Sequence, residues 1–98
     1  MTELVTGAAQ AVRAWMRMGD GQEAAAVGAA VSASLATAAS WCGVTLPAEW
    51  EAVPIGIAQG CVLMAAALLE GRDGETGVPA AVAALWRPLR VTRLEWAP

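Results

Sequence analysis

The chain has 98 residues, a length that supports one domain with a single modest core and is too short for two. Hydrophobic residues make up 57% of it and charged residues 15%, so one small domain cannot bury all of its apolar surface, and a bilayer or other protein subunits must cover the remainder. The formal net charge of -3 excludes a general nucleic-acid binder, because such proteins present clustered positive charge to the phosphates.

The first predicted helix runs from a cap at Thr6 to about Met18. Val12 and Trp15 fall on its apolar side, and we expect both side chains in the core. The two glycines in residues 19–21 then break the helix. This pattern predicts a helix that packs its apolar side against the helix that follows.

A long second helix is predicted after this break. Asp20 and Glu23 have the spacing of a capping box at its start, and the high Ala content of the segment favours helix. Gly43 is suited to end it. The core residues that we expect from this helix recur at helical spacing and are Val27, Val31 and Leu35.

The third predicted helix has Pro54 in its first turn and closes at residues 70–71. It follows a connection over residues 44–53, which contains Pro47 and a short helical turn around residues 48–52. One face of the helix is expected in the core, and its residues are Ile57, Cys61, Met64 and Leu68. A polar, glycine-rich loop over residues 72–77 comes next.

The fourth predicted helix is short, from Pro79 to about Trp86, and it stops before Pro88. Val82 and Leu85 are expected to face the core. The predicted fold class is therefore all-α. Residues 1–90 form a small bundle of about four helices, and residues 91–98 form an extended C-terminal tail.

The chain offers little for catalysis or metal binding. Cys42 and Cys61 form no CxxC motif, and no His is present to complete a zinc or thiol-catalysis set. We interpret both as small core hydrophobes. Tyr and Lys are also absent, and there is no phosphate-binding loop or nucleophile motif. We therefore expect no enzyme activity, no cofactor and no metal.

A membrane protein with one or two spans is the alternative interpretation of the apolar segments. No charged residue occurs between Ala24 and Ala48, which is long enough to cross a bilayer. Most of this segment is Ala, Ser, Thr and Gly, however, and it has few of the large aliphatic residues that drive insertion. The second apolar stretch, residues 55–69, is better matched to a core helix than to a full span. We therefore favour helices packed in water, with no membrane partner.

Two segments carry a resemblance to a known family. Residues 54–72 begin at a Pro, contain Gln59 and end in an acid followed by Arg72. Residues 78–90 form a short helix followed by Leu, Pro and Arg near the chain end. The N-terminal half has a matching layout, with a helix ending near Met18, an acidic turn at Asp20 and a long Ala-rich helix. In this order and spacing the chain resembles the head-tail connector (adaptor) family of tailed phages, including the adaptors of gene transfer agents.

The resemblance implies a structural role in particle assembly. Members of this family are helical proteins that form a homo-oligomeric ring, usually twelve-fold, beneath the portal protein. The ring joins the DNA-filled head to the tail-side neck or stopper protein. DNA passes through the channel without sequence-specific binding, which an acidic or neutral channel surface would suit. The expected location is the neck of a virion or particle, assembled in the host cytoplasm.

The C-terminal segment is the expected docking site for the portal. It follows a helix stop and combines Arg with large apolar residues, types that are enriched at interface hot spots. The candidate docking residues are Arg87, Arg90, Arg93, Leu94 and Trp96. For the first part of the segment a second interpretation stays open, in which Trp86 and Leu89 fold back onto the core of their own chain and Arg87 and Arg90 are merely solvated.

Overall fold

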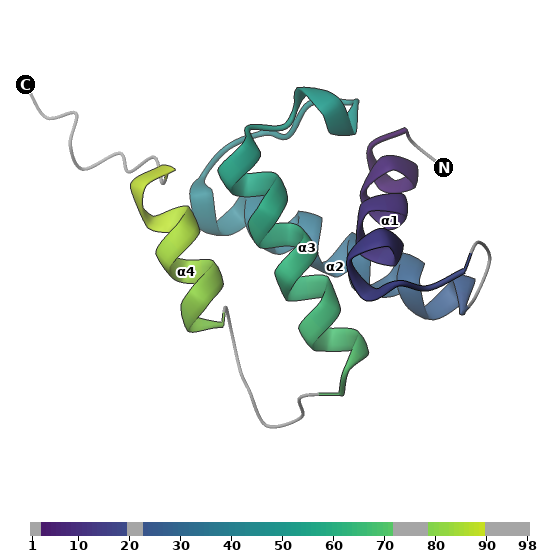
Figure 1. Ribbon diagram of the computed structural model, residues 1–98. Coiled ribbons are helices and arrows are strands. Elements are labelled where there is room, and N and C mark those ends of the chain that lie inside the picture. Colours follow the sequence, from purple (N-terminus) through teal and green to yellow (C-terminus); the bar gives the residue numbers. More distant parts are fainter. Residues whose placement is uncertain (1–2, 20–22, 72–78, 90–98) are drawn as a thin grey trace, which may run out of the picture.

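The computed structural model describes residues 3–19, 23–71 and 79–89. Within these ranges the chain folds into four α-helices and two 3₁₀ turns, with no strand (Figure 1). The helices are α1 (Glu3–Met16), α2 (Ala24–Cys42), α3 (Ile55–Leu69) and α4 (Ala80–Trp86), and the turns are η1 (Trp50–Ala52) and η2 (Arg87–Leu89). The predicted all-α class with four helices is confirmed. The predicted tail, residues 91–98, lies outside the described residues.

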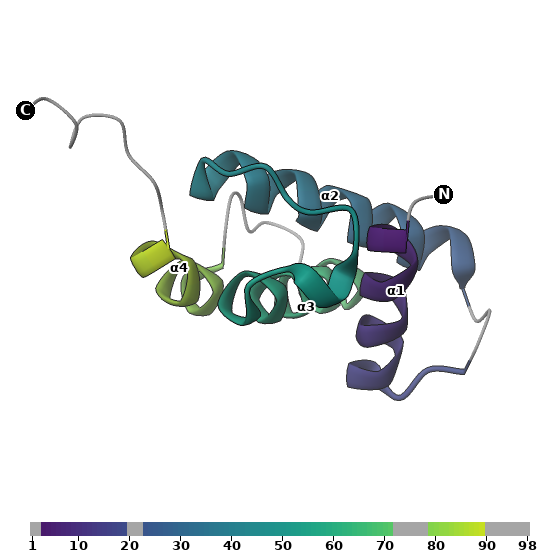
Figure 2. The ribbon, with the colours of Figure 1, turned by 90° about the horizontal axis from the view of Figure 1, so that it is seen from above.

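Helix α3 occupies the centre of this arrangement, because α1, α2 and α4 each pack against it. Figure 2 shows α2 in one layer and α3 with α4 in a second, while α1 lies across one end of both layers. Turn η1 packs on α1 and so closes the connection between α2 and α3 over that end. The bundle therefore has one central helix whose faces are shared among three neighbours.

The ends of α1 differ from the predicted ones. The helix begins at Glu3, so Thr6 lies inside it and is not its cap. An acid in the first turn is favourable there because it interacts with the positive end of the helix dipole. The helix stops at Met16, ahead of the glycines, because Arg17 adopts a left-handed conformation with φ 59°. The N–H of Met18 then donates to the carbonyl of Arg13 at 2.8 Å, which closes the last turn.

The predicted capping box at the start of α2 is wrong. Glu23 is the residue just before the helix, in a left-handed conformation with φ 49°, and no side chain caps the helix there. Its carbonyl accepts the first hydrogen bond, from Val27 N–H at 2.9 Å. A Glu at this position cannot reach back as a third-position capping acid does. Asp20 lies outside the described residues.

The predicted end of α2 at Gly43 is confirmed, and the predicted prolines lie at the starts of α3 and α4. Gly43 ends α2 with φ 74°, and both its N–H and that of Val44 donate to the carbonyl of Ala39, at 2.9 and 3.0 Å. Pro54 and Pro79 stand immediately before α3 and α4. In each case the proline carbonyl accepts the first helical hydrogen bond, and the missing proline N–H leaves no donor unsatisfied.

Most of the predicted core residues are buried in one apolar cluster: Val12, Val27, Val31, Leu35, Ile57, Cys61, Met64 and Val82, with Leu85 half-buried against them. Trp15 and Leu68 are corrections, because they are 57% and 49% exposed. The buried stripe of α1 runs through Val12 to the half-buried Met16, which leaves Trp15 on its flank. On α3 the stripe ends at the half-buried Leu69, so Leu68 faces outward.

The largest fully buried side chain is that of Trp86, at the end of α4. Its indole Nε1 donates to the carbonyl of Ile57 at 3.3 Å, and its ring lies 6.1 Å from that of Trp41, tilted by 48°. Gly60 gives the indole room, since a Cβ there would lie 2.1 Å from the indole nitrogen. We call this close approach the Gly60 notch. Leu89, which is 37% exposed, lies in the same way against Gly56. Trp86 and Leu89 thus contact their own chain, as the second interpretation of this segment holds.

The notch predicts opposite effects for two Gly-to-Ala changes in helices. Gly60→Ala should lower the free energy of unfolding by about 1–3 kcal/mol, because the added methyl overlaps a buried ring that has no room to move. Gly28→Ala in α2 meets nothing within 4 Å, so it should stabilise the protein by about 0.4–1 kcal/mol through helix propensity and a less flexible unfolded chain. Urea unfolding of both variants measures the difference. Equal changes in the free energy of unfolding would contradict the close packing of Trp86 against Gly60.

Candidate assembly surface

The exposed indole of Trp15 stands between two hollows on the face shared by α1, α3 and α4. The hollow between α1 and α3 has a volume of about 450 Å³. The other, of about 310 Å³, extends from α3 to α4. Trp15 and Leu63 line both, so they form one continuous surface, which we call the Trp15 groove. Its other lining residues are Ala11, Ala14, Gln59, Val62, Ala66, Ala67, Glu70, Pro79, Ala81 and Val82.

The groove owes its shape to small side chains on three helices. Ala11 and Ala14 on α1, Ala66 and Ala67 on α3, and Ala81 on α4 leave space that larger residues would fill. Gln59 and Glu70 are the polar side chains among the lining residues. The chemistry of the surface is therefore that of an apolar receptor, with no nucleophile and no acid–base pair in its lining.

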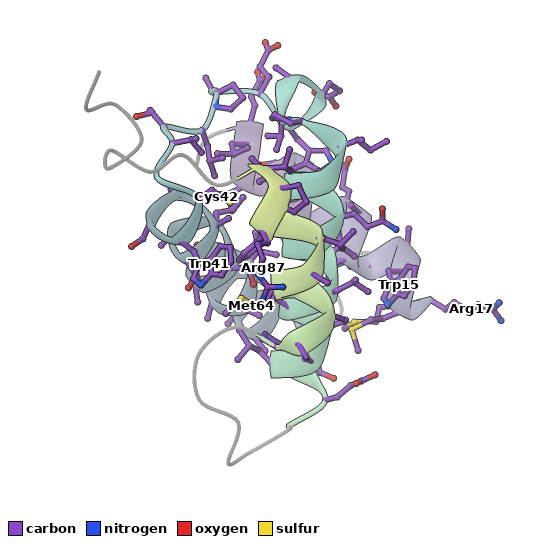
Figure 3. All side chains as sticks on the ribbon, turned by 90° about the vertical axis from the view of Figure 1, so that its left-hand side faces the viewer. Trp15, Arg17, Trp41, Cys42, Met64 and Arg87 are labelled. Carbon is purple, nitrogen blue, oxygen red and sulfur yellow. The ribbon has the colours of Figure 1, made fainter. Side chains whose placement is uncertain are left out.

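An uncovered tryptophan beside an apolar hollow is unusual for a surface that faces only water. A buried Trp contributes a large apolar area to a contact, and Trp is among the residue types most enriched at interface hot spots. Figure 3 shows Trp15 and Arg17 at one edge of the molecule, with α4 between them and the labelled residues Trp41 and Cys42. The groove is thus separate from the tryptophan pair that forms part of the core.

Of the predicted portal-docking residues, the structure describes Arg87 alone. Its side chain is exposed in η2, on the other side of α4 from Trp15 (Figure 3). Arg90, Arg93, Leu94 and Trp96 lie outside the described residues. The portal-docking set thus stays a prediction, and Arg87 does not belong to the Trp15 groove.

Helical spacing did not reveal the groove, because spacing placed Trp15 among the core residues. The sequence did contain one indication of the groove. Trp15 stands near the end of the first helix, whereas the third helix has only the small residues Ala66 and Ala67 near its own end, too small to cover the indole. Two further signals were Gly56 and Gly60 inside α3. A glycine inside a helix is unfavourable by about 1 kcal/mol relative to Ala, which suggests a packing reason. Here each one receives a large side chain from the α4–η2 segment.

The two cysteines belong to the core between α2 and α3, and both thiols are buried and reduced. The Cys61 Sγ lies 3.9 Å from the carbonyl of Ser34, to which it donates. The buried Ser34 hydroxyl donates to the carbonyl of Ala30 at 2.9 Å. Burial, with the neighbouring Cys42 adding to it, raises the pKa of Cys61 to about 12. Among the described residues, no cluster of three or more His, Cys, Asp or Glu could hold a metal ion.

Helix α2 is long and apolar enough to cross a membrane by length and composition alone, and core helices of soluble proteins pass the same test. Its larger aliphatic residues, Val27, Val31 and Leu35, are all buried inside the bundle. Its exposed face instead carries small residues such as Ser32 and Ala36. A lipid-facing helix would present its large aliphatic residues outward. This orientation favours packing in water.

Comparison of the chain with protein-family models, curated proteins and solved structures gave no match.

The raised pKa of Cys61 predicts an alkaline loss of stability. A thiol that keeps its proton in the folded state but loses it on unfolding stabilises the fold fully below pH 9, and this contribution is lost between pH 9 and about 12. The expected slope is no more than about 1.4 kcal/mol per pH unit. The chain contains no Lys or Tyr, so few other side chains titrate in this window. Urea unfolding from pH 8 to 11 measures the slope, and Cys61→Ala should reduce it. An unchanged slope in that variant would assign the effect to another group.

Proposed function

We propose that this chain is the head-tail connector (adaptor) subunit of a tailed phage or a phage-like particle such as a gene transfer agent. Copies of it form a ring beneath the portal, and the ring joins the DNA-filled head to the tail-side neck or stopper protein. The observation that carries the proposal is the Trp15 groove, an uncovered apolar surface on the helical bundle. Such a surface suits a subunit that is completed by its neighbours.

The resemblance supplies the identity of those neighbours. Its two segments, residues 54–72 and 78–90, coincide largely with α3 and with α4 and η2. In this fold they pack on each other through the Gly60 notch and so form one structural unit. Two sequence patterns that resemble the same family therefore correspond to adjacent packed elements, which supports a common origin for both.

The distribution of charge is compatible with a DNA channel. The carboxylates of Glu3, Glu23, Glu49, Glu51 and Glu70 are all exposed. The exposed arginines in the described ranges are Arg17, in the turn after α1, and Arg87, in η2, and they form no basic cluster. A surface of this kind does not grip phosphates, so DNA can move past it. The proposed subunit contacts DNA only in passing.

A membrane protein is the second candidate, and the length of α2 is the observation that favours it. Cell fractionation separates the two functions. A connector subunit should be soluble and strongly helical without detergent. Recovery in the membrane fraction, with helix formed only in micelles, would contradict the connector proposal.

Portal docking can be tested by removing residues 93–98, which include Arg93, Leu94 and Trp96. These residues follow Pro88 and are too few to form a core of their own, so we expect the truncated chain to unfold at the same temperature as the full chain. Loss of an aromatic and Arg anchor should weaken binding to portal rings by at least about 2 kcal/mol, roughly 30-fold. Co-sedimentation with the portal protein encoded nearby in the genome measures this. In particles, we expect DNA-filled heads that leak or lack tails.

The matched control for this truncation removes residues 97–98 alone, which keeps all three anchors. It should bind portal rings like the full chain. If the longer truncation fails to fold, the tail belongs to the core of the protomer. If it folds, binds normally and supports tailed particles, the segment is not the portal contact.

A further inference from the structure

Helix α1 is held to the bundle by few buried residues for its length. Of its 14 residues two are fully buried, Ala8 and Val12, whereas α2 and α3 each bury seven. It lies across one end of both layers (Figure 2). A gap too small to admit water remains where α1 meets α2 and α3. Atoms beside such a gap lose dispersion contacts, so the packing of α1 is incomplete.

A contact from the connection between α2 and α3 supplements this packing. Trp50, in η1, lies directly on α1 at Gly7. A Cβ at position 7 would lie 2.5 Å from the Trp50 Cβ, so a larger residue there would push Trp50 away. Trp50 also lines the gap beside α1, together with Ala8 and Cys61. We call the contact of Trp50 with Gly7 the Trp50 latch.

The other end of α1 carries backbone strain. Arg17 directly follows the helix and has φ 59°, a left-handed conformation that a residue with a Cβ adopts at a cost in free energy. The cost arises only while α1 is folded back on the bundle, because an open chain returns Arg17 to the favoured negative φ. Separation of α1 from the bundle therefore recovers part of the free energy that the lost contacts cost.

We propose that α1 is a latched arm, which opens about Arg17 when Trp50 leaves Gly7. Helix α1 supplies Trp15 and one wall of the Trp15 groove, so the groove exists only while the arm is closed. The latch thereby determines when this surface is present, whichever molecule occupies it. Any occupant favours the closed form, because it binds that form alone. This opening is a property of the fold and does not depend on the connector proposal.

The two cysteines can report the opening of the arm. Cys61 lines the gap beside α1. Cys42 is the last residue of α2 and lies on the other side of α4 from Trp15 (Figure 3). Both thiols are buried, and reagents that attack thiolates reach them only after they are exposed. Opening of α1 exposes Cys61 and leaves Cys42 buried, whereas unfolding of the whole chain exposes both.

Thiol labelling, read for each cysteine by mass spectrometry at increasing urea concentration, tests the arm. In the unmodified chain Cys61 should react at least about tenfold faster than Cys42, each relative to the unfolded chain, and with a smaller urea dependence, because less surface opens. Trp50→Ala removes the latch and should speed the labelling of Cys61 about 30-fold. Leu85→Ala in α4 is the matched control. It should speed the labelling of Cys42 alone, since α4 stays packed when α1 opens.

Arg17→Gly tests the same arm without removing a contact, so the test remains if Trp50→Ala does not fold. Glycine adopts positive φ freely, which stabilises the closed form and should slow the labelling of Cys61 about fivefold. Three outcomes would overturn the inference: equal labelling of the two cysteines in the unmodified chain, an unchanged Cys61 rate in both arm variants, or acceleration of both cysteines by Leu85→Ala. The measurements need no portal protein, so failure of the connector proposal would leave them unchanged.

Discussion

The close approach of Trp86 to Gly60 determines how the C-terminal part of this protein is built. Helix α4 has seven residues, too few to be stable as an isolated helix. One large indole holds it to α3 by filling the notch and donating to the carbonyl of Ile57, and to α2 by contacting Trp41. The position of α4 in turn places Ala81 and Val82 at the side of the Trp15 groove. The candidate assembly surface therefore depends on a residue that lies nowhere on it.

The contact between α2 and α3 also depends on a close approach of two helices, here made by small side chains on both. Ala30, Ser34 and Ala38 of α2 are buried in the bundle, and so are Cys61 and Ala65 of α3. Small residues let helix backbones come close, and the Ser34 hydroxyl is satisfied within its own helix, so the contact buries no unpaired donor. A core made this way contains few large aliphatic residues. Replacing any one of them with a small residue would therefore remove a large share of the buried apolar surface. Association with further copies would add stability by mass action.

The sequence predicted the four helices and most of the core residues, but it missed some helix ends and the exposed groove. Glycine and proline act locally, so Gly43 and Pro54 marked helix ends that the structure confirms. The predicted capping box at the start of α2 was wrong because Glu23 lies just before the helix, in a left-handed conformation, and is not its third residue. Trp15 was placed in the core because helical spacing gives the side of a helix but not what covers it. The groove exists because no other part of the described chain covers Trp15. Helical periodicity gives no information about such a cover, so it could not predict the groove.

The Gly60 notch also constrains how this chain can change over evolutionary time. A larger residue at position 60 needs a smaller one at position 86, yet either change alone passes through a poorly packed protein. Enlarging residue 60 first creates a clash, and shrinking Trp86 first leaves a cavity in the core. The two positions are therefore expected to change together or not at all, whereas Gly28, with open space around it, can vary independently. Covariation between positions 60 and 86 among related sequences would therefore reflect the packing of the Trp86 indole against Gly60.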